Sequence, residues 1–236
     1  MGYFFATIGS AQVTSIFAVL ALLISLLAFF PYIRDTIACR TQPQRASWLI
    51  WSVLSSIAFF TQVAEGATTS LWFIGAQFAC TFSIFKLSIW YGSGSYISRR
   101  NLTIFAAAAV GLLLWYFLEN TAYTLAIVIM ISAMGGYATV VKAYRAPESE
   151  TLSTWFMLMA ASICGVASVG VLHWMHMAYP VYLFGLYSSI AMAIILGRIR
   201  ERSAIVLDAE GLGLPTFVAA DPAPSKNMDG PQITNP

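Results

Sequence analysis

Charged residues are scarce in this sequence. Only 9% of its 236 residues are Asp, Glu, Lys or Arg, whereas about a quarter is usual in a soluble globular domain. The scarcity excludes an ordinary water-soluble fold, and 59% hydrophobic residues with a mean hydropathy of +0.76 indicate an integral membrane protein. The basic residues lie in short separate segments and the net charge is only +2, so nucleic acid is not an expected partner.

Reactive and metal-binding groups are also few. The cysteines, Cys39, Cys80 and Cys164, show no metal-binding spacing, and their odd number argues against a disulfide framework. His173 and His176 stand three residues apart without an evident third metal ligand. The sequence shows no nucleophile with a base, no phosphate-binding loop and no paired intramembrane carboxylates. It therefore predicts no enzyme, no metal site and no cofactor.

Long apolar runs are abundant. A helix that spans a bilayer needs about 20 mostly apolar residues, and seven runs in this chain approach or exceed that length. They are continuous and do not alternate with polar residues, which favours helices over strands. The predicted fold is therefore an all-α membrane protein of seven transmembrane helices in the cell membrane, with the lipid bilayer as a partner; a homo-oligomer is compatible with the sequence. The predicted spans are 12–33, 47–63, 70–91, 101–118, 121–142, 152–172 and 179–197.

The basic residues predict the orientation of these spans. Lys and Arg concentrate in cytoplasmic loops, and here they follow the first, third, fifth and seventh runs but are missing from the segments between. We therefore expect the N-terminus outside and the C-terminus in the cytoplasm. Lys86 is the exception within a span, close enough to its inner end to reach the headgroups. Residues 203–236 are rich in Pro, Gly, Asp and Asn, and we expect a disordered cytoplasmic tail.

The two halves of the chain share a weak repeat, as in many membrane transporters. The matching segments, in chain order, are 32–40 with 137–145, 47–59 with 153–165, and 71–77 with 181–187. The repeat predicts a first three-helix unit at 12–91 and a second at 121–197. A single linker helix at 101–118 lets both units enter the membrane in the same orientation.

This 3+1+3 plan resembles the PQ-loop superfamily, which includes the SWEET (MtN3/saliva-related) sugar transporters. In that family a Pro-Gln pair marks the cytoplasmic end of the first helix of each unit. The matching position here is Pro31-Tyr32, and the second unit has Gly135-Gly136-Tyr137. The literal Pro43-Gln44 lies further along, in the loop. The resemblance implies a fold that passes a small solute between its two units.

Three backbone positions are candidate hinges for such a movement. Pro31 removes a helical hydrogen bond, and Gly135 and Gly136 give the second unit similar freedom because they lack side chains. The alternative for Pro31 is that it only ends its span at the membrane surface.

Polar and aromatic residues within the spans predict a binding site. Counting about 100° per residue places them on one face of each helix, and aromatic rings with a few amides and hydroxyls suit a small neutral polar solute. The resemblance implies that a tryptophan of the second helix and an amide of the third hold the substrate, positions matched by Trp51 and Gln77. Trp48, nearer the loop, is expected in the interfacial aromatic belt. The candidate substrate-binding residues are Trp51, Ser55, Gln77, Thr81, Met157, Cys164 and Tyr187.

The predicted function is a facilitator that passes a small neutral, sugar-like solute by alternating access between the two units. The predicted spans hold no acidic residue, which argues against a carboxylate proton relay and favours facilitated diffusion. Two alternatives remain open. One is a non-transporting scaffold, sensor or assembly factor with the same fold, and the other is a transporter of vitamin precursors of the nicotinamide-riboside type.

Overall fold

The computed structural model describes residues 2–64, 70–95, 121–169 and 174–211, with six single positions between 102 and 117. The chain divides into two compact units, residues 1–197 and 198–236. Within the described residues the regular structure is helical, and the only extended pairing is an isolated bridge between Gln44 and Ser93. The prediction of an all-α chain is confirmed for this part.

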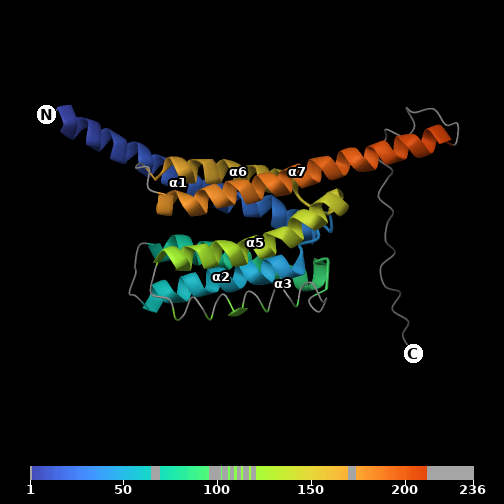
Figure 1. Cartoon of the computed structure of the whole chain (residues 1–236), viewed down its shortest axis with the longest axis horizontal. Coiled ribbons are helices and arrows are strands. Elements are labelled where there is room, and N and C mark those ends of the chain that lie inside the picture. The colour runs from blue at the N-terminus through green and yellow to red at the C-terminus, as the bar shows by residue number, and fades with distance from the viewer. Residues whose placement is uncertain are drawn as a thin grey trace. The chain divides into compact units, whose positions relative to one another are not determined.

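Each α-helix that the structure describes (Figure 1) contains or overlaps one of the predicted apolar runs. The fourth run, 101–118, lies outside the described residues apart from the single positions. In chain order, the helices are α1 (Gly2–Ile37), α2 (Arg45–Ala64), α3 (Ser70–Tyr91), α5 (Thr121–Arg145), the 3-10 turn η1 (Pro147–Ser149), α6 (Leu152–Ala167) and α7 (Trp174–Gly211).

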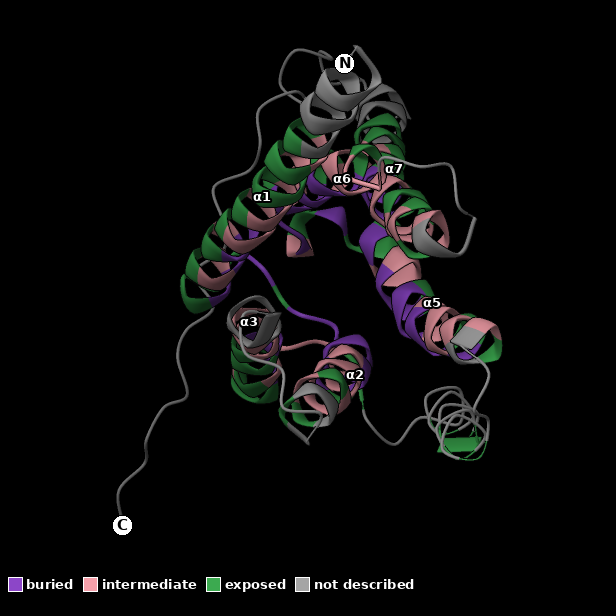
Figure 2. Cartoon of the chain, turned by 90° about the vertical axis from the view of Figure 1, so that its left-hand side faces the viewer, coloured by how far each residue is buried: buried purple, intermediate pink, exposed green. Residues whose placement is uncertain are grey.

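Among the residues that the structure describes, three stretches of helix are long and apolar enough to cross a membrane: Gln12–Ile37, Leu125–Arg145 and Met177–Ala204. Large apolar side chains lie exposed on the helices, among them Leu27 and Phe30 of α1. Figure 2 shows the buried residues turned toward the interior of the bundle and the exposed ones on its outer faces. Lipid suits such outer faces, because soluble proteins rarely expose large contiguous apolar surface. The chain is therefore a membrane protein, and its seven-span count stays a prediction.

Several helix ends differ from the predicted ones. α1 continues through Pro31 to Ile37, so this proline does not end the helix. α6 ends at Ala167, before the predicted limit at 172. α7 runs on to Gly211, so 203–211 is helical where a disordered tail was expected. That stretch holds no proline and contains Ala, Leu and Glu, which favour helix; residues 212–236 lie outside the described part.

The two sequence halves pack against each other. α1 lies against α3 of its own half and α6 of the other, and α2 lies against α3 and α5. α5 and α7 approach closely at two glycines. A Cβ built on Gly136 would lie 2.4 Å from Leu186 Cδ1, and one on Gly197 would lie 2.6 Å from the Tyr144 carbonyl oxygen. The second approach is to backbone, which cannot rotate away as a side chain can.

We therefore expect Gly197→Ala to lower the free energy of unfolding by about 1–3 kcal/mol, the usual cost of overpacking. Gly185→Ala is the matched control on α7, because a Cβ there meets nothing within 4 Å. Since alanine is also the better helix former, this control should match or exceed the parent in thermal stability in detergent. Equal melting temperatures for the two variants would contradict the close approach of α5 and α7 at Gly197.

Candidate functional site

The loops that follow α1 and α5, residues 38–44 and 146–151, meet at one end of the bundle, here called the loop end. The backbone N–H of Gln42 donates to the Ser149 carbonyl oxygen at 2.9 Å, and the hydroxyl oxygens of Thr41 and Thr151 are 2.5 Å apart. Thr151 Oγ1 also donates to Asp35 Oδ2 at 3.1 Å, so Thr41 is the donor to Thr151. All three bonds join one sequence half to the other.

A buried ion pair lies beneath these loops. Lys142 Nζ is 2.6 Å from Glu150 Oε1, and the two side chains are 12% and 0% exposed. The ammonium also donates to the carbonyl oxygens of Gln42 and Ser149, so three oxygen atoms surround it. Glu150 Oε2 accepts a hydrogen bond from Trp155 Nε1 at 3.0 Å. Both charges are therefore buried with partners, the condition under which a buried pair is tolerated.

The sequence pattern does not predict this pair. Glu150 stands in a polar segment just before an apolar helix, where an acidic residue ordinarily faces water. Its only sequence signal is Lys142 at the end of the preceding apolar run, eight residues earlier. Burial depends on how the two loops fold over one another, and no local pattern encodes that.

Tyr32 connects the ion pair to α2. Its side chain is completely buried, and its hydroxyl accepts a hydrogen bond from Trp48 Nε1 at 3.2 Å and lies near the Glu150 carboxylate. The placement of Trp48 in an interfacial belt is wrong, since this indole is only 3% exposed. Burial is tolerated because its N–H has found a partner.

Five rings, including that of Tyr32, form a continuous aromatic layer next to Glu150. Ring centroids are 5.1 Å apart for Tyr32 and Trp48, 5.2 Å for Trp48 and Trp51, and 6.1 Å for Trp155 with both Tyr32 and Tyr187. These distances are in the range where aromatic pairs attract. The layer, made of Tyr32, Trp48, Trp51, Trp155 and Tyr187, joins α1, α2, α6 and α7.

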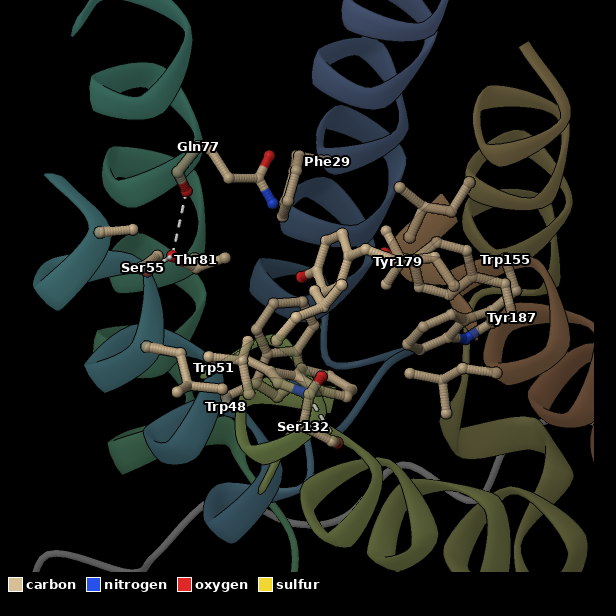
Figure 3. A pocket seen from close by; sticks show the side chains of 17 residues that line it. Phe29, Trp48, Trp51, Ser55, Gln77, Thr81, Ser132, Trp155, Tyr179 and Tyr187 are labelled. Carbon is tan, nitrogen blue, oxygen red and sulfur yellow. Dashed lines mark hydrogen bonds between the residues drawn. The ribbon is translucent and has the colours of Figure 1, made fainter. Parts of the chain in front are cut away.

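A cavity of about 530 Å³ lies on the side of this layer away from the loops (Figure 3). Six helices line it, three from each sequence half. None of the lining residues that the structure describes carries a formal charge. They are Phe29, Trp48, Trp51, Leu54, Ser55, Ala58, Gln77, Thr81, Leu125, Val128, Ser132, Trp155, Leu158, Tyr179, Leu183, Leu186 and Tyr187.

Most polar groups of the cavity wall already bond to protein. The hydroxyls of Ser55 and Thr81 are 2.7 Å apart, and Trp51 Nε1 donates to the Ser132 carbonyl oxygen at 3.3 Å. Ser132 Oγ accepts from the Tyr182 hydroxyl at 3.0 Å. The carboxamide of Gln77 differs: within the described part of the chain it has no hydrogen-bond partner, and it extends from α3 toward Phe29 (Figure 3).

The structure brings together most of the predicted site residues. Five line the cavity, namely Trp51, Ser55, Gln77, Thr81 and Tyr187. Met157 only packs against the core around the aromatic layer, and Cys164 is half-buried on α6 away from the lining.

The displacement of Met157 and Cys164 has a simple cause. The repeat alignment begins the inward face of this helix at Ser153, but Ser153 is exposed, while Thr154 and Trp155 are buried. One residue of error turns a helix face by about 100°. The lining of α6 therefore comes from Trp155 and Leu158.

The candidate hinge glycines lie where α5 packs closely on its neighbours. A Cβ on Gly135 would be 3.5 Å from Trp51 Nε1, and Gly136 faces Leu186 of α7. Ser47 Oγ donates to the Gly135 carbonyl oxygen at 2.6 Å. These contacts give the glycines a packing role, and hinge motion at Pro31, Gly135 or Gly136 stays a prediction.

Comparison with known proteins gives no match: no family model fits the chain, and no curated protein or solved structure is significantly similar to it.

The ion pair makes a sharp prediction for stability. Removing one partner of a buried pair typically costs about 3–5 kcal/mol, so Glu150→Ala should lower the melting temperature in detergent by roughly 10 °C. Glu148→Ala, an exposed position in the same loop, is the control and should change it little. The double variant Lys142→Met, Glu150→Met should recover most of the loss, because no charge stays buried alone. If Glu150→Ala and Glu148→Ala lowered the melting temperature equally, a structural role for the pair would be refuted.

Proposed function

We propose that this protein is a membrane facilitator that passes a small neutral solute by alternating access between the units 12–91 and 121–197. The observation that carries the proposal is the uncharged cavity, which residues of both sequence halves line. It is closed at the loop end by hydrogen bonds that run from one half to the other. A cavity with aromatic walls and few polar groups suits a small molecule without charge.

The proposal includes the topology and family implied by the sequence. The proposed topology has seven spans in a 3+1+3 order, with 101–118 as the linker. In this topology the loop end lies in the cytoplasm, and the proposed location of the protein is the cell membrane. The PQ-loop superfamily is the proposed family. Tyr32 stands where that family has glutamine, and here its hydroxyl accepts a hydrogen bond from Trp48 at the closed end of the cavity.

The bonds at the loop end favour an opening movement that separates no ion pair. Lys142 and Glu150 belong to the second unit, and Asp35 pairs with Arg40 of its own first unit at 2.7 Å. The contacts that must break are hydrogen bonds, such as the one between Thr41 and Thr151. A neutral bond contributes about 0.5–1.5 kcal/mol net, and the bonds to Lys142 and Asp35 about 1.5–3 kcal/mol, because water replaces the lost partner. Asp35, Lys142 and Glu150 keep their ionic partners throughout the movement. No ion pair therefore has to be broken between the state closed at the loop end and the state open there.

The proposal predicts that a covalent bond across the loop end stops transport. Thr41→Cys with Thr151→Cys places two thiols where the hydroxyl oxygens are 2.5 Å apart, close enough for a disulfide. The background lacks the native cysteines, with Cys39→Gly because that residue has φ of 57°. Swelling of proteoliposomes in glucose, ribitol, urea or 2-pyridone measures flux. For at least one solute we expect protein-dependent flux that oxidation reduces at least tenfold and reductant restores.

Each single-cysteine variant is the control, and oxidation should leave its flux unchanged. Flux that persists after complete cross-linking would contradict alternating access at the loop end. If no solute passes faster than into protein-free vesicles, the scaffold, sensor or assembly-factor alternative replaces the proposed function.

A further inference from the structure

The hydrogen-bonding groups that the cavity offers to a solute are few. Among the lining side chains that the structure describes, Gln77, Tyr179 and Tyr187 keep polar groups without a hydrogen bond to protein. The hydroxyls of Ser55 and Thr81 bond to each other and to backbone carbonyls, and the Ser132 hydroxyl accepts from Tyr182. The indole N–H groups of the lining tryptophans are likewise engaged, as with Trp51 and Ser132. A bound solute therefore meets one free carboxamide, two phenol hydroxyls and otherwise apolar walls.

Such a wall suits a sugar poorly. A hexose carries a hydroxyl on nearly every carbon, and each donates and accepts. A hydroxyl that enters an apolar site without a partner costs about 1–3 kcal/mol. Leu54, Leu125, Leu158 and Leu183 occupy wall positions where a sugar needs polar groups. The free groups of this cavity can satisfy only a few of those hydroxyls.

The same wall suits a flat ring with one polar edge. The Gln77 carboxamide places an N–H donor and a carbonyl acceptor side by side, which pairs with the N–H and C=O of a lactam or amide in two parallel hydrogen bonds. The rings of Trp51 and Trp155 supply flat faces for stacking. Their centroids are 6.5 Å apart with an interplanar angle of 61°. The leucines then cover the apolar edges of the solute.

We infer that the solute is an uncharged planar ring with a lactam or amide edge, and that Gln77 is the specificity-determining residue that binds this edge. The inference rests on the proposed facilitator function and departs from the sugar that the family resemblance implies. Charged relatives of the solute are rejected, because no described lining residue offers a counter-charge.

The test compares two rings that differ only at the edge that Gln77 binds. 2-Pyridone has a lactam N–H beside its carbonyl, and N-methyl-2-pyridone has the carbonyl alone. A ligand of the folded state raises apparent stability by mass action. At 20 mM, 2-pyridone should raise the melting temperature of the purified full-length protein, measured by size-exclusion survival after heating. N-methyl-2-pyridone should give less than half that shift, and glucose no more than the osmolyte control sucrose.

Two variants assign the effect to Gln77. In Gln77→Met, of similar size but without the amide, the difference between the two pyridones should vanish. Ser83→Ala is the matched control on α3, because its exposed hydroxyl bonds only to the Ala79 carbonyl, and it should preserve the difference.

Three results would overturn the inference. One is equal stabilisation of the parent by both pyridones, and another is no stabilisation by either. The third is a glucose shift above that of sucrose that Gln77→Met removes, which would return the substrate class to sugars and leave the facilitator function standing. Failure of the facilitator function shows itself separately, as absence of protein-dependent flux for every solute in the swelling assay.

Discussion

The ion pair between Lys142 and Glu150 is the interaction on which the rest of the site depends. Glu150 accepts from the indole of Trp155, and the nearby Tyr32 hydroxyl accepts from Trp48. These rings close the cavity at the loop end. Lys142 binds the carbonyl of Gln42 and so fixes the first loop against the second. If either partner moved away, the other charge would remain buried without compensation. The arrangement around the pair is therefore closely specified.

Each sequence half has an ionic anchor of its own, but the two anchors are different. In the first half, the Arg45 guanidinium donates to the carbonyl oxygens of Ser88 and Gly94, at 3.0 and 2.9 Å, and ties the start of α2 to the end of α3. In the second half, Lys142 and Glu150 tie the end of α5 to the start of α6. The strongest bonds therefore lie within the halves. The bonds between the halves at the loop end join mostly hydroxyl, amide and carbonyl groups. The Asp35 carboxylate and the Lys142 ammonium also take part, and each has its ionic partner within its own half.

The sequence was sufficient to predict the helices, because a continuous apolar run has few other stable forms in lipid. Five lining residues followed from the helical period of α2 and α3, from the family resemblance and from the repeat, which aligns Tyr187 with Gln77. Prediction from the sequence failed where contacts between helices determine which side chains are buried. Tyr32 and Tyr137 are aligned in the repeat, yet the first is completely buried and the second is 57% exposed. The inward face of α6 was displaced by one residue for a similar reason: the two loops differ in length and fold, and the repeat is too weak to show it. Burial of Trp48 and Glu150 also depends on contacts between the halves, such as that of Tyr32 with Trp155, which no local pattern encodes.

The neutrality of the cavity and the ionic anchors of the halves are parts of one physical arrangement. A charged solute would need a counter-charge in the wall, and that charge would lie unpaired in a low-dielectric site whenever the cavity was empty. An uncharged wall avoids this cost in every state of the cycle. The charges of Asp35, Lys142 and Glu150 instead lie at the loop end, where each has an ionic partner within its own half. Two stiff halves joined by hydrogen bonds, with an apolar cavity between them, can exchange conformations at a cost of a few hydrogen bonds, which is the scale of free energy that an uncoupled facilitator has at its disposal.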